Sequence, residues 1–456
     1  MTERAPFLST AHGAYHHRER PSDDEELTRV GPGTPCGEYL RRFWQPVILS
    51  EELRDLPRRL RIMGEDLVAF RDRSGAAGLL ELHCPHRGTS LEFGLISEKG
   101  IRCCYHGWLF DVDGTILETP GEPPDSTLKD RLFHGAYPVR DYRGLVFAYM
   151  GPPDKEREFP MFDTYDLPGY RMVARAPTLW ECNWLQVKDN SMDPAHLAFL
   201  HTLPGSQGFT EDLGALGEWD WMETPVGMVY IDTRRQGDRV WVRVADFIAP
   251  NIHQFPPNAD PMAKRTVINR PAATTWAVPL DDTHTMQIGF YRAPEGQEPR
   301  RGAGFGQDAS RTYEDRQRVP GDYDAQVSIH GGIARHGLEH LASTDRGVTM
   351  MRNMIRRGIR SVQDGADPAH PGMLNGAAIA TFAHDRVVPG IPPAATPEED
   401  SRLLREVARN VVAEMVNLSL SALGGGEGRG EVGEVAFRTA ARPPHPPASR
   451  APPSPP

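Results

Sequence analysis

Four residues with metal-binding side chains lie in two short segments of the chain. Cys84 and His86 lie in the first segment and Cys103 and His106 in the second, in the pattern C-x-H-x16-C-x2-H. Two Cys and two His can hold either a tetrahedral zinc ion or a [2Fe-2S] cluster in which two histidines replace two cysteines on one iron. A zinc finger usually pairs Cys with Cys and His with His, whereas each segment here offers one of each. The spacing therefore favours the cluster over zinc.

A second possible metal site follows further along the chain. Asp193, His196 and His201 form the pattern D-x2-H-x4-H. Residues five apart lie about 140° apart around an ideal helix, so the two imidazoles converge on one metal only if the helix ends or bends between them. Two His and a carboxylate form the facial triad of a non-haem Fe(II) oxygenase. Two histidines alone are more often structural, but the preceding cluster motif favours iron.

Together the two motifs resemble the catalytic subunits of Rieske non-haem iron aromatic-ring oxygenases. Segments such as GIRCCYHGWLFD and EHLASTDRG look most like the branch of phthalate and phenoxybenzoate dioxygenases and related O-demethylases. The resemblance implies that Cys84 and Cys103 bind one iron of a Rieske [2Fe-2S] cluster, and that His86 and His106 bind the other. It also implies that His196 and His201 bind a mononuclear Fe(II), and that the protein is a homotrimer.

Two carboxylates complete this interpretation. In the family, the residue matching Asp193 hydrogen-bonds a Rieske histidine of the neighbouring subunit and an iron-binding histidine of its own. Asp193 also precedes Pro194, as a good helix N-cap would, and capping alone could explain it. The third iron ligand is expected in the segment PGDYDAQ, where we choose Asp322 over Asp324.

Composition limits the classes of protein to consider. The 456 residues suggest two or three domains, and 39% hydrophobic with 25% charged residues is ordinary for a globular protein. The sequence contains no apolar run of membrane-spanning length and no apolar core of a signal peptide. Five cysteines, two of them assigned as thiolate ligands, suggest a reducing compartment, and we expect the cytoplasm. A net charge of −11 argues against nucleic acid as a partner, because binding to nucleic acid depends on neutralising phosphates.

The pattern of elements predicts an α+β protein with four regions. Residues 1–44 should pack on the catalytic domain, and residues 45–155, dense in short strand signals, should form a small all-β Rieske domain. Residues 156–425 should form a larger catalytic domain, with an antiparallel sheet surrounded by helices. The Pro-rich tail, 426–456, lacks apolar residues to bury and should be disordered.

The expected function is oxygenation of an aromatic compound, with aromatic carboxylates among the candidates. Electrons from NAD(P)H should arrive through a separate reductase or ferredoxin, because no Gly-rich nucleotide-binding motif follows a strand in this sequence. The cluster would pass them to the iron, where O₂ reacts. O-demethylation of an aryl ether would use the same metal centres and stays open. A Rieske electron-transfer protein without oxygenase activity is the alternative from another class.

Overall fold

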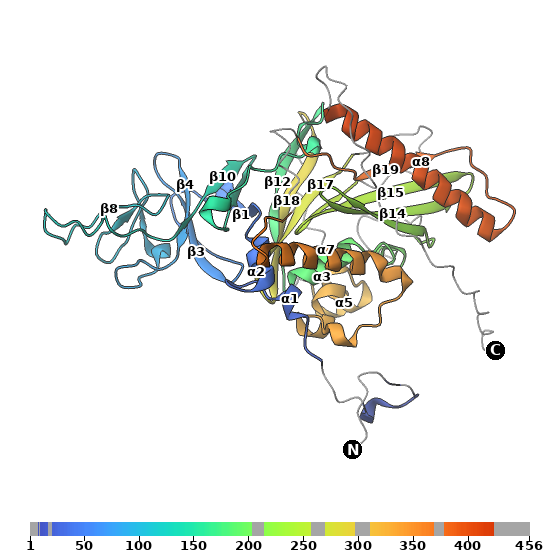
Figure 1. The fold of residues 1–456 in the computed structure, drawn as a ribbon, viewed down its shortest axis with the longest axis horizontal. Helices are drawn as coiled ribbons and strands as arrows, with labels where there is room; N and C mark the ends of the chain where they lie inside the picture. Colours follow the sequence, from blue (N-terminus) through green and yellow to red (C-terminus); the bar gives the residue numbers. More distant parts are fainter. Residues whose placement is uncertain are drawn as a thin grey trace.

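The computed structural model describes residues 8, 10–16, 21–202, 214–256, 270–296, 311–368 and 378–423, without the side chains of 417–423. The Pro-rich tail predicted to be disordered lies outside these residues. The chain forms a small all-β part at one end and a larger part in which helices surround an antiparallel sheet (Figure 1). This arrangement confirms the predicted α+β class.

The small part contains three antiparallel sheets. Their strands, in sheet order, are β1 (Gln45–Leu49), β11 (Leu145–Ala148) and β10 (Val139–Tyr142); β2 (Arg58–Ile62), β3 (Glu65–Arg71), β4 (Ala77–Glu81) and β9 (Ala136–Tyr137); and β5 (Leu95–Ile96), β6 (Ile101–Arg102), β7 (Leu109–Phe110) and β8 (Ile116–Glu118). Val68, Phe70 and Leu80 pack with Ile101 and Phe110 in the core between the second and third sheets. This core fixes the loops that the third sheet carries.

One large antiparallel sheet organises the rest of the chain. Its strands, in sheet order, are β12 (Tyr170–Trp180), β18 (His284–Pro294), β17 (Ala273–Asp281), β16 (Ile252–Phe255), β15 (Arg239–Ile248), β14 (Gly227–Gln236) and β13 (Glu218–Thr224), with β19 (His384–Val388) also paired to β15. Successive side chains on a strand point to opposite faces, so each face can meet a different set of helices.

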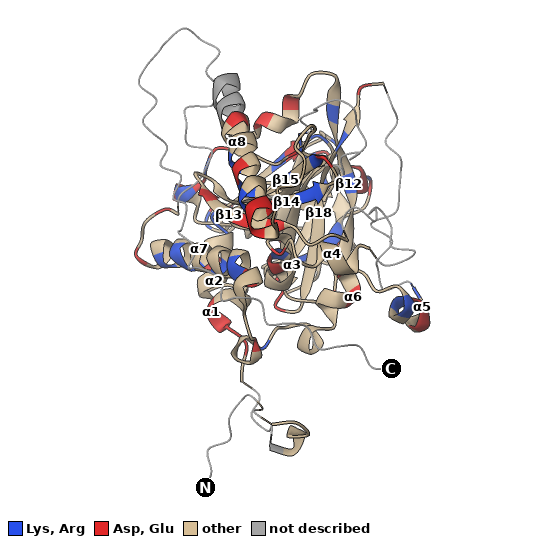
Figure 2. Cartoon of the chain, turned by 90° about the vertical axis from the view of Figure 1, so that its right-hand side faces the viewer, with Lys and Arg blue, Asp and Glu red and all other residues tan. Residues whose placement is uncertain are grey.

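The long helix α8 (Pro397–Leu423) covers one face of this sheet (Figures 1 and 2). Its Val407 and Val411 pack with Val242 and Val244 of β15, which removes apolar surface from water on both elements. Charged side chains tie α8 to the edge of the sheet. Examples are Arg235–Asp400 at 2.5 Å and Arg405–Glu218 at 2.7 Å.

The other face carries the helices that matter for the site. These are α1 (Glu25–Thr28), α2 (Pro35–Leu40), α3 (Trp184–Ser191), α4 (Leu197–Leu200), α5 (Tyr313–Arg318), α6 (Asp322–Val327) and α7 (Arg346–Gln363). The indole of Trp184 on α3 donates to the Leu27 carbonyl on α1 at 3.0 Å. Tyr39 on α2 approaches α7 so closely that a Cβ added to Gly358 would lie 2.4 Å from its ring. The N-terminal helices therefore pack on the helices of the larger part.

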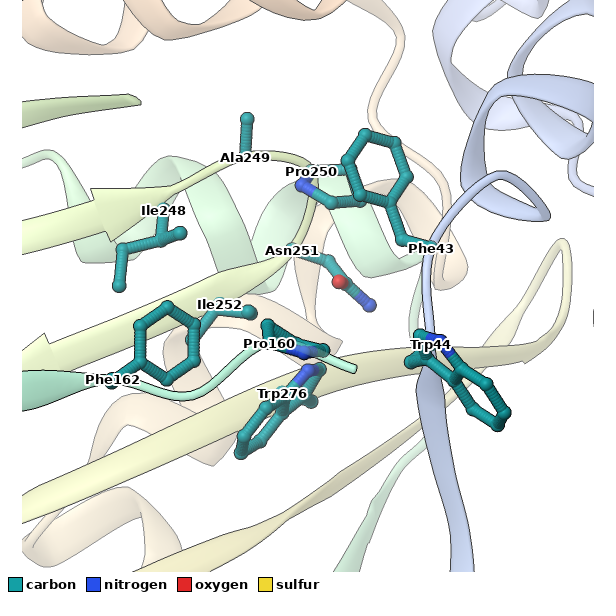
Figure 3. A pocket seen from close by; sticks show the side chains of 10 residues that line it. All are labelled: Phe43, Trp44, Pro160, Phe162, Ile248, Ala249, Pro250, Asn251, Ile252 and Trp276. Atoms are coloured by element: carbon teal, nitrogen blue, oxygen red, sulfur yellow. The ribbon is translucent and has the colours of Figure 1, made fainter. Parts of the chain in front are cut away.

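Backbone and side-chain contacts join the two parts. The amides of Met63 and Gly64 donate to the carbonyls of Pro279 and Leu280, each at 2.8 Å. Beside this junction Phe43 and Trp44 line a small cavity together with Trp276 of β17 (Figure 3). Within the described ranges, none of the helices has both the length and the hydropathy needed to span a lipid bilayer.

Candidate active site

The two predicted cluster-binding segments form loops of the small domain, one after β4 and the other between β6 and β7. Each loop closes with a glycine amide that donates to the carbonyl of its cysteine, Gly88 to Cys84 at 2.9 Å and Gly107 to Cys103 at 3.1 Å. Both glycines have positive φ angles, +75° and +76°, which residues other than glycine rarely adopt. The glycines therefore allow the tight turns that present the ligands.

The four predicted ligands divide by burial. Cys84 and Cys103 are buried, whereas His86 and His106 are exposed and their rings lie 4.5 Å apart. Trp108 stacks on His86 at 4.8 Å, with the two rings nearly parallel. Burial, together with the neighbouring Cys103, raises the pKa of Cys84 to about 11, so a metal is needed to hold its thiolate. Thiols inside and imidazoles outside fit a Rieske cluster, with one iron on each side.

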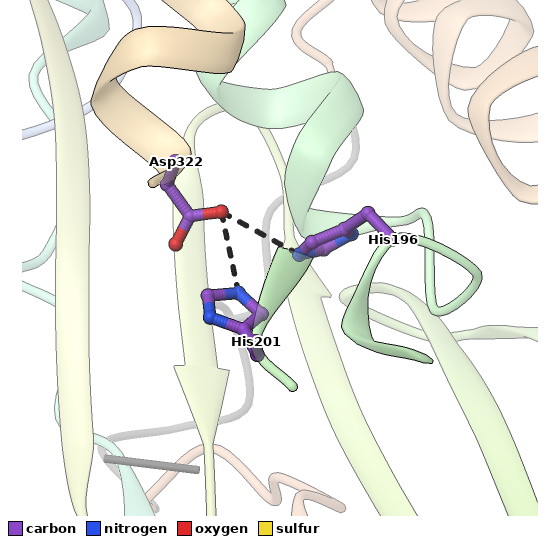
Figure 4. Close-up of side chains that lie close together, drawn as sticks. All are labelled: His196, His201 and Asp322. Atoms are coloured by element: carbon purple, nitrogen blue, oxygen red, sulfur yellow. Dashed lines mark ion pairs between the residues drawn. The ribbon is translucent and has the colours of Figure 1, made fainter. Parts of the chain in front are cut away.

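The second metal motif lies on the helical face of the large sheet. Oδ1 of Asp322 lies 3.6 Å from Nε2 of His196 and 3.3 Å from Nε2 of His201 (Figure 4). One possible ligand atom of each residue lies within 4.8 Å of the other two. Two imidazoles and a carboxylate at this separation fit a single Fe(II) with open positions.

Short helices bring these three residues together. The helix between the histidines, α4, has four residues, so His196 and His201 lie just outside its two ends. The helix therefore ends between the two histidines, as their convergence on one metal requires. The backbone at His201 (φ −94°, ψ 3°) is no longer α-helical. Its ring is therefore not held at the angle of about 140° from His196 that an ideal helix would impose. Asp322 is the first residue of α6.

The two candidate carboxylates on α6 have different partners. Asp322 faces the histidines and accepts a hydrogen bond from Asn190 of α3 at 3.4 Å. Asp324 instead accepts from the Gly321 amide at 3.0 Å and pairs with Arg316. The structure therefore brings Asp322 to the metal motif and uses Asp324 to hold the start of α6. Burial opposes ionisation of Asp322, but His201, His196 and Asn190 together lower its pKa below the ordinary value.

Asp193 makes two contacts within its own subunit. Its Oδ1 accepts from the Ala195 amide at 2.8 Å, as in a capping turn. Its Oδ2 lies 3.7 Å from Nδ1 of His196. Burial lowers the pKa of His196, but Asp193 and Asp322 together raise it above the ordinary value. One carboxylate thus caps the turn before α4 and orients a histidine of the metal motif.

Comparison with known proteins identifies the family. The model of the family described as "Rieske [2Fe-2S] domain" matches residues 43–142. The chain is 43% identical, over 91% of its length and 94% of the relative, to the oxygenase subunit of tert-butanol monooxygenase / tert-amyl alcohol desaturase from Aquincola tertiaricarbonis. The chain belongs to the Rieske non-haem iron oxygenases. This oxygenase is also 37% identical to phenoxybenzoate dioxygenase subunit alpha from Ectopseudomonas oleovorans, over 81% of its own chain and 93% of that one.

Solved structures agree on the fold of this Rieske oxygenase. Pseudomonas putida CBB5 NdmB superimposes with a TM-score of 0.58 at 18% identity, over 72% of this chain and 93% of that one. Dicamba monooxygenase superimposes with a TM-score of 0.56 at 19% identity, over 71% of this chain and 98% of that one. Family membership confirms the two predicted cofactors, a Rieske [2Fe-2S] cluster and a mononuclear iron.

Sequence reasoning gave no role to two polar residues of α3. Asn190 contacts Asp322, and Lys188 is buried in the same helix. Lys188 lies four residues from Trp184 and from Met192, both of which are buried. That spacing places Lys188 on the apolar stripe of the helix, which is a signal that the sequence contained.

Proposed function

We propose that this oxygenase binds its mononuclear iron through His196, His201 and Asp322, and its cluster through Cys84, His86, Cys103 and His106. The observation that carries the proposal is the convergence of two imidazoles and one carboxylate in a chain with a Rieske domain. When bound, the iron supplies O₂ activation and the cluster supplies single electrons.

The residues around the iron site have distinct tasks in this proposal. The Asn190 amide orients Asp322, so that one carboxylate oxygen faces both histidines. Asp193 orients His196 from the opposite side of its ring. His201 is buried, so protein and not bulk water surrounds its ring. These contacts fix the ligands and leave the remaining positions for O₂ and substrate.

We further propose that the substrate is a small aromatic compound. The support is the sequence similarity to two relatives, at 37% identity to phenoxybenzoate dioxygenase subunit alpha and 30% identity to the oxygenase subunit of phthalate 4,5-dioxygenase. O-demethylation of an aryl ether uses the same residues, and a relative 31% identical is 5,5'-dehydrodivanillate O-demethylase. Hydroxylation of a tertiary alcohol is the second candidate, because the tert-butanol monooxygenase subunit shares 43% identity.

Electron transfer is proposed to cross between subunits of a head-to-tail homotrimer. Within one subunit the third sheet of the small domain lies at the far end from the helices of the iron site (Figure 1). Exposed apolar side chains lie beside both sites: Tyr105 next to His106, and Phe199 on α4. In a ring, these surfaces would meet and Asp193 would bridge His196 to a cluster histidine of the partner.

Electrons are proposed to come from a separate NAD(P)H-dependent reductase or ferredoxin. The support is that the relatives are named as subunits or components, which implies multicomponent systems. The proposed cytoplasmic location rests on the five cysteines, all of which are free thiols in the structure.

Replacing His196 tests the iron assignment. His196→Ala should lose the mononuclear iron and substrate oxidation, while the visible spectrum of the cluster stays intact, because the two sites lie in different domains. His284→Ala, at a partly exposed histidine of β18, is the matched control and should keep both. Retention of turnover and of the mononuclear iron by His196→Ala would contradict the proposal, as would loss of the cluster.

A further inference from the structure

A lysine is buried in the catalytic domain, and none of the residues that the structure describes pairs with its charge. Lys188 on α3 is 1% exposed. Among the residues that the structure describes, none forms a hydrogen bond or ion pair with its ammonium group. Its neighbours on the helix do have partners: Asp189 pairs with Arg352 at 2.7 Å, and Asn190 donates to Asp322. Burying an unpaired ammonium costs free energy that the fold does not recover.

Lys188 belongs to the surroundings of the iron site. α3 packs on β17, and His253 of β16 is aligned with Thr275 of β17 and Phe247 of β15, so these three side chains share one face of the sheet. Burial lowers the pKa of His253 well below the ordinary value, and the charges of Lys188 and His196 contribute to this shift. The geometric link to the iron site is α3 itself, because Lys188 is buried on this helix two residues before Asn190, which donates to Asp322.

Other cations on this face of the sheet do have carboxylate partners. Arg234 donates to Asp232 at 2.8 Å, and Arg243 lies 3.8 Å from Asp385. Arg243 and Phe247 both lie at odd-numbered positions of β15, so their side chains point to the same face of the sheet as His253. Asp232 is the cross-strand partner of Arg243 and shares that face. These two arginines thus have carboxylate partners, whereas Lys188 has none among the described parts of the chain.

The environment of Lys188 matches a binding group better than a structural one. Burial lowers the pKa of Lys188 to about 7, and no neighbouring carboxylate of the described residues offsets this effect. His253 adds a buried Nδ1 that lacks a hydrogen bond. Groups whose pKa is strongly shifted by burial and that lie near a reaction centre are common in functional sites.

We propose that Lys188 is a specificity-determining residue whose ammonium group pairs with an anionic oxygen of the substrate, so that this oxygenase takes aromatic substrates bearing a carboxylate. His253 supplies a second polar contact beside it. This inference rests on the proposed function and names the substrate class of the same site. A neutral substrate, such as an aryl ether without a carboxylate or a tertiary alcohol, is the opposite outcome.

Paired ligands test the inference on the holoenzyme. The affinities of benzoate, 3-methoxybenzoate and 4-phenoxybenzoate are measured by calorimetry, each against its primary amide, which keeps the shape and removes the charge. Wild-type protein should prefer at least one carboxylate to its amide by about tenfold or more. Lys188→Met should abolish that preference and leave amide affinity unchanged, because Met keeps the length of the side chain. Lys99→Met, at an exposed lysine of the small domain, should change neither.

Proton uptake gives a second readout that a merely structural lysine would not show. At pH 8 an anion that pairs with Lys188 should draw a proton onto the amine, so the binding enthalpy should depend on the ionisation enthalpy of the buffer. Lys188→Met should remove this dependence. Lys188→Gln serves as a second variant should Lys188→Met fail to fold, which its melting temperature and cluster spectrum report.

Three results would overturn the inference: no carboxylate of the panel binds wild-type protein, wild-type protein binds the amides equally well, or Lys188→Met keeps the preference. Oxygen consumption separates this failure from failure of the proposed function. An enzyme that consumes O₂ with neutral substrates alone retains its function and refutes the role of Lys188. An iron-loaded enzyme that consumes O₂ with none of the carboxylates, amides, aryl ethers or tertiary alcohols refutes the proposed function.

Discussion

Asp193 makes two contacts within its own subunit at the same time, one to the Ala195 amide and one to His196. The first contact needs only an oxygen acceptor, which an asparagine also provides. The second, and any bridge to a neighbouring subunit, depends on negative charge. The two roles of this residue can therefore be separated by one substitution.

Asp193→Asn should keep the fold and both metal centres but slow electron transfer to the iron. The amide oxygen still caps the turn, whereas the charge that orients and polarises the imidazoles is lost. We expect a loss of at least about tenfold in the rate at which the reduced cluster is reoxidised by O₂ and substrate, measured by stopped-flow absorbance. An unchanged rate would reduce Asp193 to a helix cap. Asp193→Ala serves for comparison because it removes the cap as well.

Lys188 should make stability depend on pH in a defined window. The pKa is about 7 in the folded protein and about 10.5 in an unfolded chain. Below pH 7 both states carry the charge and the folded state bears the full cost of burying it, on the order of a few kcal/mol. Between pH 7 and pH 10.5 only the unfolded state keeps the proton, so the cost declines as pH rises.

Urea unfolding of ligand-free wild-type protein and Lys188→Met measures this effect. The variant should be the more stable at pH 6, and its advantage should shrink at pH 9, because groups common to both proteins cancel in the comparison. An advantage that is the same at both pH values would show that the lysine is not buried as a charged group.

At the scale of elements, the site depends on how closely α7 approaches the turn between α3 and α4. Gly347 at the start of α7 lies against Trp221 of β13, whose indole donates to the Met192 carbonyl at 3.1 Å. Met192 immediately precedes Asp193. A contact far from Asp193 in sequence therefore fixes the backbone that positions it.

Gly347→Ala should disturb both stability and iron binding. The added Cβ would lie 2.0 Å from Trp221 Nε1 and 2.5 Å from the Met192 carbonyl oxygen, so α7 or the turn must shift. We expect a loss of about 1–3 kcal/mol in the free energy of unfolding and lower iron occupancy, measured by urea unfolding and metal analysis. Gly121→Ala, which adds a Cβ into open space, is the matched control. Full stability and full iron occupancy in Gly347→Ala would show that the contact is dispensable.

At the scale of the whole molecule, the small domain and the iron site lie apart within one chain (Figure 1). We propose that cluster and iron therefore cooperate across subunits, with a second chain bringing its own cluster to the iron site. The proposed head-to-tail ring makes each active site a property of two subunits. Two inactive variants should therefore be able to complement each other.

Mixed oligomers test this complementation. His106→Cys adds a charged thiolate ligand and so lowers the potential of the cluster, and His196→Ala removes an iron ligand. Each variant alone should be inactive. Oligomers containing both chains, purified through two different tags after co-expression, should recover part of the activity, because a wild-type cluster then faces a wild-type iron site. Inactive mixed oligomers, or a fully active monomer, would contradict transfer between subunits.

The family, the α+β class and both cofactors could be inferred from the sequence because their signals are local. The C-x-H-x16-C-x2-H pattern lies on two loops closed by glycines, and His196 and His201 flank one short helix. For such closely spaced residues, the local backbone conformation alone determines how the side chains lie relative to one another, whatever the rest of the fold. Resemblance to the family favours Asp322 over Asp324, and the structure shows the physical difference in their partners.

Tertiary structure alone decided which distant residues serve the site. Asp322 and Asn190 meet because α3 and α6 pack side by side, and Lys188 is buried because α3 lies on the sheet. The apolar stripe of α3 signals the burial of Lys188, but whether its charge has a partner depends on the chain segments that pack around it. Long-range pairing is a property of the packed chain, and for that reason spacing along the sequence could not reveal it.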